Sequence, residues 1–154
     1  MILSNKNTLQ RLLVVIPLMF LLLGCETYSD GGLIGKTEKR VTGKTWILDK
    51  YYLDGIDETS SLIISNLTEN YNENGTYLRE YTDKNGDPVS ESGTWQFDTD
   101  KQLFNISGVG SMEITVQTGT VSSSDYFILR MVKDELVYNY DNGSSNHEFH
   151  FIAN

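Results

Sequence analysis

Beyond residue 42 the sequence predicts an all-β fold, a small antiparallel up-and-down β-barrel of about eight strands. Short runs of alternating apolar and polar side chains recur along this part of the chain, and turn-forming Gly, Asn and Asp residues separate them. No 12-residue stretch after Cys25 shows the period of an amphipathic helix. Because an open meander would leave unpaired edges, closure into a barrel is favoured, and an open β-sandwich is the alternative.

The first strand is predicted at residues 46–53, which alternate before an Asp-Gly turn at 54–55. Residues 57–66 are ambiguous, because their apolar centre fits either a strand or a short helix across one end of the sheet. The Asn-Gly pair at 74–75 predicts a tight hairpin, since both residues tolerate the positive φ that such a turn requires.

A second hairpin joins predicted strands at 76–82 and 89–97, and Trp95 and Phe97 share one face of the later strand. Another strand is expected at 102–107.

The last third of the chain continues the same pattern. Two strands are predicted from their apolar faces, the first formed by Met112, Ile114 and Val116 and the second by Phe127, Leu129 and Met131. A Ser-rich loop at 118–124 separates them, and the final strands are expected at 136–140 and 147–152.

The charge of the chain is acidic, with 21 Asp and Glu residues against 12 Lys and Arg residues and a formal net charge of −9. All of the acidic residues follow Cys25. Such a surface repels nucleic acid and anionic lipid headgroups, so neither is expected as a partner. The acidity is interpreted as a solubility feature of an exported domain.

The N-terminal segment has the features of an export signal. Lys6 and Arg11 precede an unbroken apolar run at 12–23. That run is too short to span a bilayer as a helix, which needs about 20 residues. Ordinary signal peptidase prefers a small side chain at the third residue before its cut. For a cut ahead of Cys25 that residue is Leu22, so a different cleavage is expected.

The run Leu22-Leu23-Gly24-Cys25 resembles the lipobox of bacterial lipoproteins. The resemblance implies a lipoprotein signal peptide at 1–24, cleavage before Cys25, and a diacylglycerol on the Cys25 sulfur, which palmitate labelling would detect. Residues 25–42 would then be a lipidated flexible tether, and two acyl chains would give stable anchoring. By analogy with lipoprotein sorting in Gram-negative bacteria, Glu26 favours the outer membrane. The alternative is a buried free cysteine in a membrane-anchoring or core helix.

Several short runs resemble the lipocalin-like domains of bacterial surface lipoproteins. They are Gly43-Lys44-Thr45-Trp46-Ile47-Leu48, Tyr71-Asn72-Glu73-Asn74-Gly75-Thr76-Tyr77, Ser92-Gly93-Thr94-Trp95-Gln96-Phe97 and Lys133-Asp134-Glu135-Leu136-Val137-Tyr138. The resemblance implies a lipocalin-like β-barrel domain over residues 43–154. It also implies a membrane-anchored cell-envelope protein that binds a small hydrophobic or glycan ligand.

The sequence offers little that could perform catalysis. His147 and His150 fall on opposite faces of a strand, which prevents shared metal binding, and both are interpreted as ordinary surface or edge residues. The acidic turns at 83–87 and 98–100 lack the later Glu of a calcium loop, and no nucleophile elbow is present. No catalytic residue, metal or cofactor is therefore predicted, although carboxylate pairs for glycoside hydrolysis can be tested only by distance.

The aromatic residues could line a ligand cavity or fill the barrel, and filling is favoured because eight strands leave a narrow interior. They are Trp46, Trp95, Tyr71, Tyr77, Tyr138, Tyr140, Phe149 and Phe151. The sequence assigns no ligand-binding residue. The alternative function is a non-catalytic interaction module that docks on an envelope protein partner through loops such as 118–124.

Overall fold

The computed structural model describes residues 37–98, 102–116, 119–121 and 125–154. Cys25 and the predicted signal peptide at 1–24 lie outside the described residues, so their processing stays a prediction. Within the described part of the chain, no helix is both long and apolar enough to cross a membrane.

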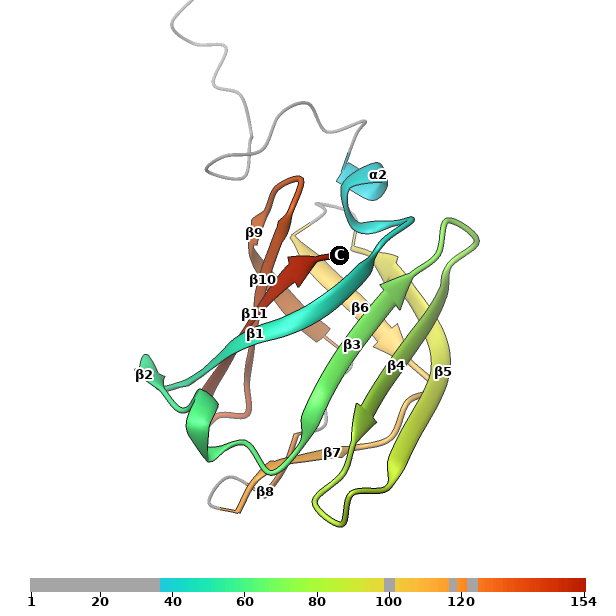
Figure 1. Ribbon diagram of the computed structural model, residues 1–154. Helices are drawn as coiled ribbons and strands as arrows, with labels where there is room; N and C mark the ends of the chain where they lie inside the picture. Colours follow the sequence, from blue (N-terminus) through green and yellow to red (C-terminus); the bar gives the residue numbers. More distant parts are fainter. Residues whose placement is uncertain (1–36, 99–101, 117–118, 122–124) are drawn as a thin grey trace, which may run out of the picture.

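Eight of the described strands form one closed antiparallel barrel (Figure 1). Their order around the barrel is β11-β10-β9-β6-β5-β4-β3-β1, and β1 pairs with β11 to close the ring. These strands are β1 (Thr45–Leu53), β3 (Ser65–Tyr71), β4 (Thr76–Thr82), β5 (Pro88–Phe97), β6 (Leu103–Ser107), β9 (Asp125–Met131), β10 (Glu135–Asp141) and β11 (Asn146–Ala153). The predicted eight-stranded barrel is confirmed, and the sandwich alternative is wrong because the β1–β11 pairing joins the two sides of the sheet.

The remaining described elements lie at the two ends of the barrel. Helix α2 (Thr37–Val41) lies at one end, and the hairpin of β7 (Met112–Thr115) and β8 (Gly119–Val121) lies at the other (Figure 1). Strand β2 (Ile56–Asp57) pairs with the end of β1, and the 3-10 helix η2 (Thr59–Ser61) follows it. The ambiguous stretch at 57–66 therefore contains a short helical turn followed by the start of β3.

Both predicted hairpins are present. Gly75 has φ +81°, and the Asn72 backbone N–H donates to the Thr76 carbonyl oxygen at 2.9 Å across the first turn. In the second hairpin Thr82 pairs with Pro88. The predicted hairpin is confirmed, but only Gly75 of the Asn-Gly pair has a positive φ.

The last part of the predicted tether is folded onto the barrel. Thr37 and Val41 of α2 are buried, and the Trp46 indole Nε1 donates to the Val41 carbonyl oxygen at 2.8 Å. Gly43 then turns the chain into β1 with φ +74°. The prediction of a flexible tether is wrong for residues 37–42, because a single helical turn is too short to show a periodic pattern in the sequence.

The predicted inner face of β9 is wrong in part. Phe127 and Leu129 are 53% and 43% exposed, whereas Tyr126 and Ile128 are buried. The pairing of β9 with β10 skips Leu129, and this bulge returns Met131 to the interior. One extra residue changes the face on which later side chains lie, so simple alternation fails here.

The segment after β6 also departs from its prediction. Met112 and Ile114 are buried as expected. Val116 is instead 81% exposed, and Thr115 is buried in its place. The register of the β7–β8 pairing shifts just before Thr115. The prediction of a continuous loop at 118–124 is wrong for Gly119–Val121, which form β8.

Aromatic rings fill the middle of the barrel and contact one another from β3 through β6 and β10 to β11. Tyr71 of β3 stacks on Phe104 of β6 with ring centroids 5.0 Å apart, and Phe104 contacts the Tyr138 ring of β10 at 6.2 Å. Tyr138 in turn stacks on Phe151 of β11 at 5.4 Å. These contacts support a filled interior over a hollow one.

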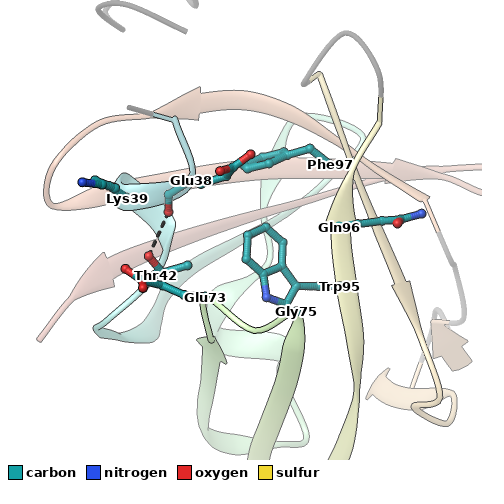
Figure 2. Close-up of a pocket in the computed structure, with 8 residues that line it drawn as sticks. All are labelled: Glu38, Lys39, Thr42, Glu73, Gly75, Trp95, Gln96 and Phe97. Carbon is teal, nitrogen blue, oxygen red and sulfur yellow. Dashed lines mark hydrogen bonds between the residues drawn. The ribbon is translucent and has the colours of Figure 1, made fainter. Parts of the chain in front are cut away.

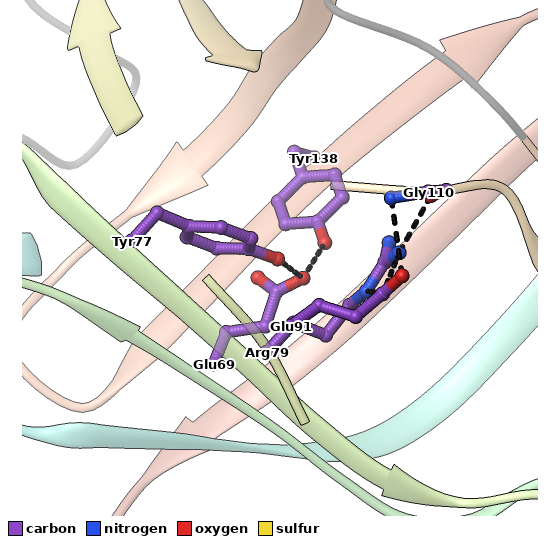
Figure 3. A network of polar contacts seen from close by, with 6 residues as sticks. All are labelled: Glu69, Tyr77, Arg79, Glu91, Gly110 and Tyr138. Carbon is purple, nitrogen blue, oxygen red and sulfur yellow. Dashed lines mark hydrogen bonds and ion pairs between the residues drawn. The ribbon is translucent and has the colours of Figure 1, made fainter. Parts of the chain in front are cut away.

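A carboxylate lies among these rings. Glu69 is 2% exposed and accepts hydrogen bonds from the hydroxyls of Tyr71 at 2.7 Å, Tyr77 at 2.6 Å and Tyr138 at 2.9 Å. Figure 3 shows two of these contacts. Burial raises the pKa of the Glu69 carboxyl, while the three hydroxyl donors oppose that shift. The residue thus joins β3, β4 and β10 through the core.

Candidate functional site

A pocket of about 390 Å³ opens at the α2 end of the barrel (Figure 2). This volume is within the range of small-molecule sites. Three segments that are distant in the sequence form the pocket: α2 with the residue that follows it, the β3–β4 turn, and the end of β5. The lining residues are Glu38, Lys39, Thr42, Glu73, Gly75, Trp95, Gln96 and Phe97.

Trp95 and Phe97 form the aromatic wall of the pocket, and their predicted shared face is confirmed. The Trp95 backbone N–H donates to the Gly75 carbonyl oxygen at 2.9 Å, and its indole Nε1 donates to the Asn72 carbonyl oxygen at 2.9 Å. The Phe97 ring meets the indole edge-on, with centroids 5.3 Å apart. The wall is therefore held in one orientation by the neighbouring hairpin.

Polar side chains surround this wall. The Thr42 hydroxyl donates to the Glu38 carbonyl oxygen at 3.0 Å and ties the end of α2 to its first turn. Glu38, Lys39, Glu73 and Gln96 are all exposed. The Gln96 side chain points away from the Trp95 ring (Figure 2), so the rim beside the aromatic wall comes from α2 and the β3–β4 turn. Its carboxylates accept hydrogen bonds, as the hydroxyl groups of a ligand require.

Two of the residues that line the pocket have carboxylate side chains. Glu38 and Glu73 are two carboxylates in one pocket, as glycoside hydrolysis requires. Both side chains are exposed. Within the described ranges, no three His, Cys, Asp or Glu residues are grouped to hold a metal ion.

No protein-family model and no curated protein matches the sequence. Among solved structures, the chain is similar to Japanin from Rhipicephalus appendiculatus bound to cholesterol, with a TM-score of 0.50 and 14% identity over 74% of this chain and 76% of that chain. It is also similar to a lipocalin-like protein from Bacteroides uniformis, with a TM-score of 0.47 and 13% identity over 73% of this chain and 97% of that chain. At such identities the likeness shows a shared fold alone.

The pocket residues contributed by α2 could not be found from the sequence. Glu38, Lys39 and Thr42 fall in the stretch expected to be a tether, and five helical residues give no detectable period. The sequence places Glu73 only in a predicted hairpin turn. The available signal was the Asn-Gly turn at 74–75, because hairpin turns gather at the ends of a barrel.

The two histidines lie on opposite faces of β11, as their spacing predicts. His150 is partly exposed and pairs with Glu148, but His147 is 1% exposed, so its interpretation as a surface residue is wrong. His147 Nδ1 lies 2.8 Å from the Tyr51 hydroxyl, and Asn142 Nδ2 donates to His147 Nε2 at 3.2 Å. The Tyr51 hydroxyl gives this polar side chain a partner inside the barrel.

In both acidic turns an Asp carboxylate accepts hydrogen bonds from backbone N–H groups. The Asp83 carboxylate accepts the backbone N–H groups of Asn85 and Asp87, and these hydrogen bonds lower the pKa of its carboxyl. Asp98 likewise accepts two backbone N–H groups, and residues 99–101 lie outside the described residues. Both carboxylates have the turn-forming role expected from the sequence.

Because the His147 imidazole is buried, we expect the stability of the protein to depend on pH. Burial lowers the pKa of His147 below its ordinary value of 6.5, so the unfolded chain binds this proton more readily than the folded chain. The free energy of unfolding should therefore fall as the pH drops through 6.5 toward the folded pKa.

Urea unfolding of wild type and His147→Gln at several pH values between about 5 and 8 measures this dependence. The difference between the two curves isolates the histidine, since every other titrating group is shared. Parallel curves across that range would contradict a buried neutral His147.

Proposed function

We propose that the chain is a lipid-anchored binding protein of the cell envelope, and that it holds a small saccharide in the α2 pocket. The supporting observation is the combination of an aromatic wall with a rim of hydrogen-bonding side chains around one concave space. An aromatic ring packs against the apolar face of a sugar while polar neighbours bond to its hydroxyl groups.

The filled barrel favours the pocket over the interior as the site of binding. A ligand in the barrel centre would have to displace stacked rings such as Phe104 and Tyr138. The fold shared with Japanin, whose structure holds cholesterol, makes a sterol-like molecule the competing ligand class. The rim argues against a sterol here, because burying its exposed charged groups beneath an apolar ligand would cost free energy.

The proposed anchor is consistent with this site. The described chain begins at α2, so the stretch that leads back to Cys25 joins the barrel beside the pocket. A diacylglycerol on Cys25 would therefore tether the protein by its pocket end. An envelope protein of this design would bind saccharides close to the membrane to which it is attached, which we propose to be the outer membrane of a Gram-negative bacterium.

Variants of the pocket should weaken saccharide binding. Phe97→Ala removes part of the aromatic wall, and Glu73→Gln removes a charged acceptor from the rim. Each should raise the Kd by about fivefold or more, the loss expected for one good contact. Isothermal titration with cellobiose, chitobiose and lactose measures the effect.

Matched controls lie outside the pocket. Phe127→Ala removes an exposed ring from β9, and Glu80→Gln removes an exposed carboxylate from β4, so both should bind as wild type does. If wild type gives no binding heat with any of these disaccharides, or if the controls weaken binding as much as the pocket variants, the saccharide proposal is wrong.

The anchor is tested separately at Cys25. Cells grown with radiolabelled palmitate should yield labelled wild-type protein in the membrane fraction, because only a thiol provides the sulfur for thioether formation. Cys25→Ser should carry no label and leave that fraction. A wild-type protein that takes up no palmitate, or that keeps residues 1–24, would contradict the anchor.

A further inference from the structure

Positive charge is concentrated at one corner of the barrel. Residues 37–44 and 129–135 together hold five of the eight Lys and Arg residues in the described part of the chain. The same two segments hold only three of its eighteen Asp and Glu residues, which are Glu38, Asp134 and Glu135. The five cations, called the basic corner below, are Lys39, Arg40, Lys44, Arg130 and Lys133.

The two segments that carry these cations meet in space, where α2 lies beside the β9–β10 turn (Figure 1). Arg40 Nη1 donates to the Met131 carbonyl oxygen at 3.5 Å, at the end of β9. The Lys44 ammonium donates to the Lys133 carbonyl oxygen and lies 5.0 Å from the centroid of the Trp46 ring. The basic corner is therefore one continuous surface.

The acidic residues at this corner offset only part of its charge. Arg130 Nε pairs with Glu135 at 2.6 Å, and both side chains are partly exposed. Glu38 and Asp134 are also exposed, which leaves an excess of positive charge. The turns at the opposite end of the barrel are acidic instead. The turns at 54–58, 83–87 and 141–145 contain Asp54, Asp57, Glu58, Asp83, Asp87 and Asp141, with Lys84 as their basic residue.

Exposed apolar side chains lie beside the basic corner. Leu129, the neighbour of Arg130, is 43% exposed. Ile152 of β11 is 45% exposed and pairs with Glu135 across the β10–β11 ladder. A surface with both cations and apolar side chains suits the headgroup region of a bilayer, because the cations meet phosphate groups while the apolar side chains enter the interface.

The chain that leads to the proposed anchor joins the barrel at this same corner. Helix α2 begins at Thr37, and residues 25–36 connect it to Cys25. Twelve residues reach at most about 40 Å when fully extended. A lipidated Cys25 would therefore hold the basic corner near the bilayer surface, where the local concentration of headgroups is high.

We propose that the basic corner lies against anionic headgroups of the membrane that holds the Cys25 anchor, with Leu129 and Ile152 at the interface. This inference rests on the proposed anchor and adds an orientation to it. The net charge of the whole chain predicts repulsion from such a membrane, but salt screens exposed charges beyond about 8 Å. The corner therefore acts locally, and the acidic turns of the opposite end point away from the membrane.

Vesicle binding by the unanchored protein tests this contact apart from the anchor. The protein is the chain of residues 25–154 with Cys25→Ser, and the probes are phosphatidylcholine vesicles with and without phosphatidylglycerol. At low salt, binding to the vesicles that contain phosphatidylglycerol should be at least about fivefold tighter. Added salt should remove this difference, because it screens the charges.

Two double variants with the same change in net charge separate the corner from the chain as a whole. Lys39→Glu with Lys133→Glu reverses two exposed cations of the corner and should weaken binding to the anionic vesicles about tenfold. Lys50→Glu with Lys84→Glu reverses two exposed cations elsewhere and should change it less than about twofold. Urea unfolding checks that each double variant is folded.

Leu129→Ser tests the apolar part of the contact. Its control is Ile56→Ser, since Ile56 is 64% exposed on β2 at the opposite end of the barrel. Only Leu129→Ser should weaken binding. Absence of wild-type binding, equal binding to both kinds of vesicle, or an equal loss in the two double variants would overturn the proposed contact. Palmitate labelling of Cys25 does not depend on these results, so the anchor and the contact can fail separately.

Discussion

The rest of the structure depends on how the barrel accommodates the carboxyl group of Glu69 at its centre. A buried carboxyl without partners costs several kcal/mol, so its neighbours must supply hydrogen bonds. Tyr71, Tyr77 and Tyr138 do so from three different strands, and each brings an aromatic ring into the same space. Satisfying one acidic side chain therefore also fills the barrel, and it links β3 and β4 to β10.

A filled centre determines where this protein can bind anything. The described pocket lies at the α2 end, and the β7–β8 hairpin lies at the opposite end (Figure 1). The α2 end offers an aromatic wall with a polar rim, whereas Met112 and Ile114 of β7 contribute buried apolar side chains at the other end. The two ends thus differ in the chemistry of their side chains.

The sequence predicted the features of the fold that follow from local turn and alternation patterns. The hairpin at 74–75, the strands and their closure followed from turn residues and from alternation. It failed where a bulge interrupts alternation, as at Leu129, and where an element is too short to show a period, as in α2. It could not locate the pocket, because Glu38 and Trp95 meet only after the barrel has closed. The burial of His147 likewise depends on its contact with Tyr51 across the β1–β11 seam.

The most direct measurement is urea unfolding of Glu69→Ala, with Glu80→Ala as an exposed control on the neighbouring strand. Three tyrosine hydroxyls lose their acceptor, so the variant should lose about 3 kcal/mol or more of unfolding free energy. The control should stay within about 0.5 kcal/mol of wild type. A Glu69→Ala protein as stable as its control would show that the buried carboxyl does not organise the barrel.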